Sequence, residues 1–189
     1  MNAAQKPVRP GPAVLVPTRS DRALATQQWL LSTLDEEGRS RAQTEWAEHR
    51  MALLSLGTLF SAVRIPGRLV HVLADPTEPA DADAFLSDTL DGGPVICDPN
   101  AIRYYALVPA STPEKWREAA EGWRSLGVEV LGRGTVLGVP RVDVVEFDPC
   151  TYSSYWSVSM SSAAMLCEPR DVARLIAAGR HQLEAEADA

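Results

Sequence analysis

The chain of 189 residues is 46% hydrophobic and 6% aromatic, a composition typical of a globular domain and not of a disordered chain. Its 18 Lys and Arg residues against 25 Asp and Glu residues give a formal net charge of -7, which disfavours non-specific binding to nucleic-acid phosphates unless the basic residues gather on one face. Because no segment resembles a signal peptide or a membrane span, we expect a cytoplasmic protein without a membrane partner.

Proline content and apolar patterning divide the chain into two parts. Residues 1–18 are rich in proline and are expected to form a flexible arm. Residues 19–189 alternate between helical and strand patterns, and no internal repeat is present. We therefore expect a single α+β domain, with a mostly antiparallel, mixed sheet flanked by helices.

The first part of this domain is predicted to contain two helices and two strands. Apolar side chains recur at spacings of three and four over residues 20–34 and again over residues 40–57, which predicts a helix in each. Two β-rich runs follow, over residues 59–65 and 67–75, and the dipeptide Pro66-Gly67 separates them. This pattern predicts a hairpin or a bulged bend.

The middle of the chain is predicted to contain a helix, a hairpin and a second helix. The acidic segment 79–90 predicts a helix with carboxylates in its first turn, where the helix macrodipole favours them. Two strands over residues 94–98 and 102–110 are joined by a turn, which indicates a hairpin. The S-x-x-E pattern that begins at Ser111 predicts a capping box and one helix over residues 111–126.

The glycine-rich segment 127–141 raises the question of a phosphate-binding loop. Such a loop needs its glycines between a strand and the N-terminus of a helix, whereas here a predicted helix precedes the glycines and more strand follows them. We interpret Arg133-Gly134 as a turn that joins two antiparallel strands of a meander, continued by a strand over residues 142–147. A strand over residues 153–160 and a helix from Pro169 complete the prediction.

The sequence contains no complete catalytic constellation. The three cysteines form no C-x-x-C pair and have no histidine at metal-ligand spacing, so we expect reduced thiols, no bound metal and no cofactor. No G-x-S-x-G nucleophile elbow is present. One alternative stays open, an enzyme of unrecognised class that uses Asp81, Asp83 and Asp98 together with His71.

Several short residue groups follow one another in a distinctive order between residues 60 and 180. They are Gly93-Pro94-Val95, Pro99, Tyr104-Tyr105, Val128 to Val130, Gly132, Gly134, Val136-Leu137, Pro140 and Tyr155-Trp156. In this order the chain resembles the N-terminal domain of the bifunctional DNA primase/polymerase family, part of the archaeo-eukaryotic primase superfamily. The resemblance implies a primase/polymerase-like core.

The chain departs from this family at the positions that carry the chemistry. The family has a D-x-D carboxylate pair for two-metal phosphoryl transfer, where this chain has Ala62-Val63-Arg64-Ile65. An S-x-H motif of the family is replaced by Pro140-Arg141-Val142-Asp143, so the histidine that contacts the nucleotide is missing as well. The resemblance therefore implies a degenerate member without polymerase activity.

A non-catalytic domain of this kind is expected to act as a binding or accessory module, for instance in DNA replication or in plasmid- or phage-related processes. Its partner is expected to be nucleic acid, a nucleotide or another protein. The candidate nucleic-acid contacts are Arg64, Arg68, Arg103, Tyr104, Tyr105, Arg133 and Arg141. A protein-interaction module is a further alternative, and exposed tryptophans are the sign that would favour it.

Overall fold

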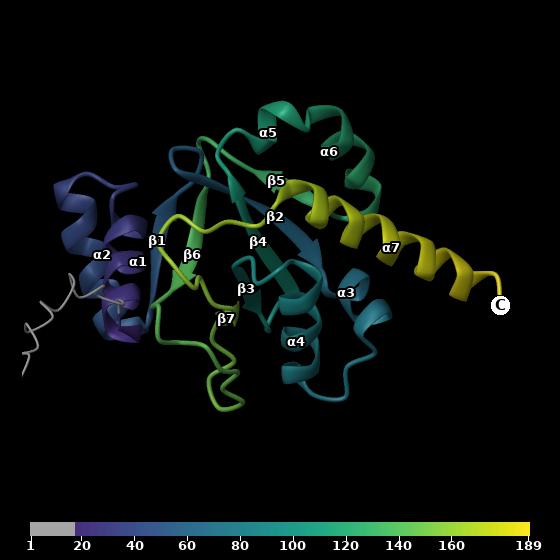
Figure 1. Ribbon diagram of the computed structural model, residues 1–189, viewed down its shortest axis with the longest axis horizontal. Helices are drawn as coiled ribbons and strands as arrows, with labels where there is room; N and C mark the ends of the chain where they lie inside the picture. The colour runs from purple at the N-terminus through teal and green to yellow at the C-terminus, as the bar shows by residue number, and fades with distance from the viewer. Residues whose placement is uncertain (1–17) are drawn as a thin grey trace, which may run out of the picture.

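A computed structural model describes residues 18–189 and shows an α+β fold (Figure 1). The helices are α1 (Arg19–Leu31), α2 (Glu36–His49), α3 (Gly67–Ala74), α4 (Pro79–Thr89), α5 (Thr112–Lys115), α6 (Arg117–Trp123) and α7 (Pro169–Ala187), with a 3-10 turn, η1, at Arg124–Leu126. The strands are β1 (Met51–Ser55), β2 (Phe60–Pro66), β3 (Val95–Asp98), β4 (Arg103–Pro109), β5 (Glu129–Leu131), β6 (Val136–Pro140) and β7 (Tyr155–Val158). The predicted arm lies outside the described residues except for Thr18, which caps α1.

The strands form two separate antiparallel sheets. The larger sheet has five strands in the order β5-β2-β4-β3-β7, and the smaller one is a ribbon of β1 and β6. All of these pairings are antiparallel. The expected α+β class with a mostly antiparallel sheet is thus confirmed, and the predicted β3–β4 hairpin is present.

The five-stranded sheet is buried on both faces. Side chains alternate between the two faces along each strand, so each strand contributes to both sides. One face carries Val63, Ile65 and Ala106 and packs against α3, α4 and α7. The opposite face carries Ile96 and Trp156 and packs in a second apolar cluster with residues of α1, α2, β1 and β6 (Figure 1). Two hydrophobic cores therefore hold one sheet between them.

Residues 51–57 form a strand and a turn, so the helix predicted over residues 40–57 was wrong in its C-terminal part. Arg50 adopts a left-handed backbone conformation with φ 60°, and this ends α2. The next five residues alternate in burial and pair with β6 along their length. The helical spacing in this stretch overlapped with a period-two pattern, and pairing with a strand more than 80 residues away selected the latter.

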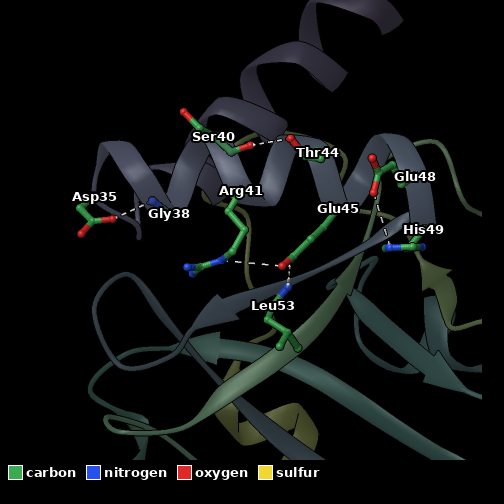
Figure 2. Close-up of polar contacts among 9 residues, drawn as sticks. All are labelled: Asp35, Gly38, Ser40, Arg41, Thr44, Glu45, Glu48, His49 and Leu53. Carbon is green, nitrogen blue, oxygen red and sulfur yellow. Dashed lines mark hydrogen bonds and ion pairs between the residues drawn. The ribbon is translucent and has the colours of Figure 1, made fainter.

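Helix α2 covers the edge of the β1–β6 ribbon (Figure 2). The carboxylate of Glu45 accepts a hydrogen bond of 3.1 Å from the backbone N–H of Leu53 in β1 and lies 3.7 Å from Arg41 (Figure 2). In the core of the same layer, the indole of Trp46 donates to the carbonyl of Val139 at 2.9 Å. Side chains of α2 thus bond one backbone group in each strand of this short ribbon, and the Glu45 contact occupies an N–H group of β1 that could otherwise pair with another chain.

Residues 67–74 form the helix α3 and not the second strand of a hairpin. Leu69 and Val70 are buried in the core and Leu73 packs against it, a spacing that a helix satisfies as well as a strand does. The backbone N–H of Gly67 donates to the carbonyl of Ile102 at 2.8 Å, which ties the start of this helix to the loop before β4. Pro66 therefore ends a strand and leads into a helix.

The helix predicted over residues 111–126 is broken into α5, α6 and η1. The expected capping box at Ser111 is absent, since its side chain makes no capping hydrogen bond. Trp116 interrupts the helical backbone and contacts Trp123, with ring centroids 6.1 Å apart. This segment lies beside β5 at the edge of the sheet, where few core contacts favour a continuous helix.

The two strands on either side of Arg133-Gly134 belong to different sheets, so the predicted hairpin and meander were wrong. β5 pairs with β2, whereas β6 pairs with β1. Residues 142–147 contain turns and no strand. A glycine outside this segment makes room for the crossing between the sheets. Gly57, with φ 85°, lies so close to the Arg133 backbone that a Cβ atom on it would come within 2.4 Å of the Arg133 nitrogen.

Candidate ligand-binding pocket

A cavity of about 310 Å³ lies at one end of the sheet, where segments distant in sequence meet. We call it the tyrosine pocket. Its lining comes from α3 and the loop after it, from the start of α4, from β3 and β4, and from the 141–155 region, and it consists of His71, Pro76, Thr77, Glu78, Pro79, Ala82, Cys97, Pro99, Ile102, Tyr104, Phe147, Tyr152 and Tyr155. The volume is at the lower end of the range for small-molecule sites, about 300 Å³ and above.

The floor of the pocket is a row of three side chains that cross adjacent strands. Cys97 in β3 is the register partner of Tyr104 in β4 on one side and of Tyr155 in β7 on the other. Directly opposed residues point to the same face of a sheet, so the three side chains lie next to one another. All three are buried, and Tyr155 is only 1% exposed. The sheet register therefore fixes the position of both phenol groups.

His71 on α3 forms one wall and is held by Tyr104. A hydrogen bond of 3.1 Å joins His71 Nε2 to the Tyr104 hydroxyl, and the two rings meet edge to face with centroids 5.9 Å apart. Burial lowers the pKa of His71 from its usual 6.5, which favours the neutral imidazole at physiological pH. The buried position also raises the pKa of Tyr104, so this phenol is neutral.

Tyr155 connects the pocket to a carboxylate behind it. Its hydroxyl lies 3.2 Å from both oxygens of Asp83 in α4, and the Ser157 hydroxyl donates to the same carboxylate. Burial raises the pKa of Asp83, and the hydrogen bonds from Ser157 and Tyr155 oppose this effect. The pKa of Tyr155 is raised as well, chiefly by burial, so the phenol stays protonated. Its O–H group donates a hydrogen bond to the Asp83 carboxylate.

Cys97 is a packed thiol and not an activated nucleophile. Burial raises its pKa to about 12, and the charges of Asp83 and Asp98 act in the same direction. A reactive cysteine needs a lowered pKa, because the thiolate is the nucleophilic form. The expectation of reduced cysteines agrees with the structure, in which Cys97, Cys150 and Cys167 are all free thiols.

Two rim residues have strained backbones. Ile102 has φ 47° and Tyr152 has φ 50°, both in the left-handed region that β-branched and bulky residues rarely adopt. Both side chains line the pocket although they are largely exposed, at 57% and 48%. The Asn100 side chain donates to the Tyr152 carbonyl at 2.9 Å and so connects the two rim segments. Strain of this kind occurs preferentially at ligand sites.

The candidate nucleic-acid contacts do not form one cluster. Arg64 and Tyr105 are register partners, and Arg103 lies two residues before Tyr105, so these three share one face of the sheet. Each arginine lies opposite a carboxylate: Arg64 is paired with Glu129, and Arg103 is the register partner of Asp98.

The remaining candidates lie elsewhere. Tyr104 is buried on the opposite face of the sheet, where it lines the tyrosine pocket. Arg68 donates to the carbonyl of Leu126 at 2.7 Å, and Arg141 forms a bidentate pair with Asp143. Arg133 is exposed in the turn before β6.

The acidic residues singled out with His71 have separate local roles. The Asp81 carboxylate accepts hydrogen bonds from the backbone of Thr77 and Glu78 at the start of α4. Asp98 accepts from the backbone of Ala101 in the turn of the hairpin. Within residues 18–189 there is no group of three or more His, Cys, Asp or Glu side chains placed to hold a metal ion. Of this set, only His71 lines the tyrosine pocket, with Asp83 directly behind Tyr155.

Sequence reasoning missed most of the tyrosine pocket. Phe147 and Tyr152 lie in a segment predicted as strand and loop, and Cys97 was interpreted as a packed thiol. Their convergence depends on the register of β3 with its two neighbours and on the helical state of residues 67–74. The one available signal was aromatic content, since Tyr104 and Tyr155 lie within runs predicted to be strands.

Comparisons of the chain with protein-family models, with curated proteins and with solved structures gave no match. Among the helices of residues 18–189, none combines the length and the apolar character required to cross a membrane. The resemblance to the primase/polymerase family stays a prediction.

Proposed function

We propose that this chain is a non-catalytic binding module that holds a small organic molecule in the tyrosine pocket. The observation that carries the proposal is the convergence of three tyrosines, a histidine and a phenylalanine on one cavity from α3, β4 and the 141–155 region. Ligand sites typically combine such an aromatic lining with a few fixed polar groups. Several groups with shifted pKa values, among them His71 and Cys97, lie at the same place, as is common at functional sites.

Binding is favoured over catalysis because the buried polar groups on the floor of the tyrosine pocket keep their neutral forms. The Cys97 thiol and the two buried phenols all have raised pKa values, so none of them supplies a nucleophile or a base at neutral pH. Within the described residues the side-chain hydrogen-bond partner of His71 is the Tyr104 hydroxyl, and a phenol whose pKa is raised is a poor nucleophile. These groups are suited to orient a ligand through hydrogen bonds.

A primase/polymerase-like origin, with an accessory role in DNA replication or in plasmid- or phage-related processes, is part of this proposal. The non-catalytic part of this proposal is supported by β2, the segment that the resemblance aligns with the family's metal-binding carboxylates. There Ala62, Val63 and Ile65 are buried apolar residues, and Arg64 is paired with Glu129. A strand of this composition has no ligand for the divalent ions that phosphoryl transfer requires.

The test is an NMR titration of the ¹⁵N-labelled protein with a set of small organic molecules that covers cationic, neutral and anionic compounds. We expect at least one compound to shift amide signals of the pocket segments, around residues 71, 97 and 152, in a saturable manner. Tyr152→Ala should weaken that binding, whereas Tyr105→Ala, a half-buried tyrosine on the opposite face of the sheet, should not. The proposal would be contradicted if no compound shifts these signals, or if the two variants bind the compound equally well.

Single-stranded nucleic acid is a second candidate, favoured by the shared face of Arg64, Arg103 and Tyr105. Fluorescence anisotropy of labelled single-stranded DNA should then show saturable binding that weakens steeply as salt is raised. Arg103→Gln should reduce it, while Arg124→Gln in η1, which is also exposed, should leave it unchanged. Absence of binding at low salt would remove this candidate.

A protein-interaction module marked by exposed tryptophans is not favoured. All five tryptophans lie within the described residues, and each is buried or half-buried.

A further inference from the structure

We propose that the tyrosine pocket selects an organic cation, of which a quaternary ammonium group is the best fit. The inference rests on the proposed function and specifies the chemical class of the ligand. It is carried by the combination of an aromatic lining with negative charge and without any Lys or Arg side chain.

The aromatic walls have the composition of an ammonium-binding cage. Phe147 contacts Tyr152 edge to face, with ring centroids 5.3 Å apart, and lies 6.2 Å from the ring of Tyr155. Together with Tyr104 and His71 these rings line one cavity from several sides. Aromatic rings carry negative charge on their faces, and cages of this kind bind quaternary ammonium groups through cation–π attraction.

The charges around the tyrosine pocket favour a cation as well. The lining contains no Lys or Arg, and its one carboxylate is that of Glu78 at the rim. A second carboxylate, Asp83, lies directly behind the Tyr155 hydroxyl, which donates to it. Burial of His71 keeps the imidazole neutral, so it adds no opposing charge. A cation that leaves water at this place is therefore compensated by both rings and carboxylates.

An anionic ligand is disfavoured, although the N-terminus of α4 is near the tyrosine pocket. The Asp81 carboxylate, in the first turn of α4, accepts hydrogen bonds of 2.9 Å from the backbone N–H groups of Thr77 and Glu78, immediately before the helix. Its negative charge opposes the positive end of the helix dipole and would repel a second anion.

The hydrogen-bond pattern favours a quaternary over a primary ammonium group. A primary ammonium needs three hydrogen-bond acceptors around its nitrogen, whereas the walls here are mainly rings and apolar side chains, and the one carboxylate of the lining, Glu78, lies at the rim. A quaternary ammonium has no N–H group to satisfy, and its methyl groups pack against rings. Shape and charge are then sufficient for recognition.

The experiment compares three molecules of nearly the same shape but different charge: choline, its neutral carbon analogue 3,3-dimethyl-1-butanol, and 3,3-dimethylbutanoate. Dissociation constants are measured by NMR titration of the full chain. We expect choline to bind roughly tenfold or more tightly than the neutral alcohol, in line with the strength of desolvated cation–π contacts, and the anion to bind most weakly.

Variants separate the contributions of the rings and the charges. Tyr152→Ala and Glu78→Gln should each weaken choline binding about fivefold or more and affect the neutral alcohol less, because each removes an interaction with positive charge. Glu118→Gln, at an exposed carboxylate of α6 outside the tyrosine pocket, is the matched control and should change neither.

The outcomes distinguish this inference from the proposed function. If the neutral alcohol binds as tightly as choline and Tyr152→Ala weakens both equally, the tyrosine pocket binds ligands but does not select cations. The same conclusion follows if choline fails to bind and another compound of the broader set occupies the tyrosine pocket. If no compound of any charge shifts the pocket signals, both the cation inference and the proposed function are overturned.

Discussion

Replacement of Gly179 by alanine tests how α7 positions the pocket-bearing helix α3. A Cβ atom at Gly179 would lie 2.4 Å from the carbonyl oxygen of Leu69 and 3.2 Å from its carbonyl carbon. Both are backbone atoms of α3, so a side chain cannot rotate away to relieve the overlap. The two helices therefore have to move apart, and α3 carries His71 with it.

Two opposing effects decide the magnitude. Alanine in place of glycine stabilises a helix interior by about 1 kcal/mol. Overpacking of a close contact typically costs about 1–3 kcal/mol, and here the contact is with rigid backbone. We expect Gly179→Ala to lower the free energy of unfolding by up to about 2 kcal/mol.

Urea denaturation followed by tryptophan fluorescence measures this change, with Gly122→Ala as the matched control. A Cβ atom at Gly122, in the exposed helix α6, would meet no atom within 4 Å, so the control should gain up to about 1 kcal/mol. A Gly179→Ala protein as stable as the Gly122→Ala protein would refute the close packing of α7 on α3.

Three further predictions concern the core, the buried carboxylate and the rim. Trp46→Phe should lower the free energy of unfolding in urea by about 1–3 kcal/mol, since the buried Val139 carbonyl loses its donor; an unchanged value would contradict the contact. Burial raises the pKa of Asp83, so the native state binds the Asp83 proton more tightly than the unfolded chain does. The wild type should therefore lose stability relative to Asp83→Asn as the pH rises from 3.8 through the raised pKa. Urea unfolding between pH 3.5 and 7, roughly, measures that difference, which should be flat or of opposite sign if Asp83 is not desolvated. Ile102→Gly should raise the free energy of unfolding in urea by up to about 1 kcal/mol through relieved strain, and should weaken ligand binding; a lower free energy of unfolding would show that the left-handed conformation of Ile102 is not strained.

The elements with strong local signals were predictable from the sequence. The turn in the hairpin of β3 and β4, the acidic start of α4 and the Glu168-Pro169 start of α7 each contain their own turn or capping residues. These signals act within a few residues, so they need no tertiary context. The same holds for the α+β class, which follows from the alternation of such elements.

The elements that were wrong depend on distant partners. Residues 51–55 become a strand because β6 pairs with them, and residues 67–74 become a helix because α7 and the sheet bury that form of them. Short apolar runs fit either period, so the sequence alone does not decide between helix and strand. The error at residues 67–74 hid the position of His71 on α3.

The tyrosine pocket was out of reach of sequence reasoning for the same reason. His71, Cys97 and Tyr152 share no motif or spacing, and only the register of three strands and the packing of α3 bring them together. Asp83 was singled out, but as a possible residue of an enzyme site, whereas it accepts a hydrogen bond from Tyr155. A pocket assembled from single residues on separate elements leaves little trace in one sequence.

The central claim is that a small organic molecule occupies the tyrosine pocket, and intermolecular nuclear Overhauser effects test it most directly. With a saturating concentration of the compound that binds most tightly, which we expect to be choline, the ligand protons should show contacts to ring protons of Phe147, Tyr152 and Tyr155, and none to the Tyr105 ring on the opposite face of the sheet. Contacts to Tyr105 alone, or to no aromatic ring of the tyrosine pocket, would contradict the account.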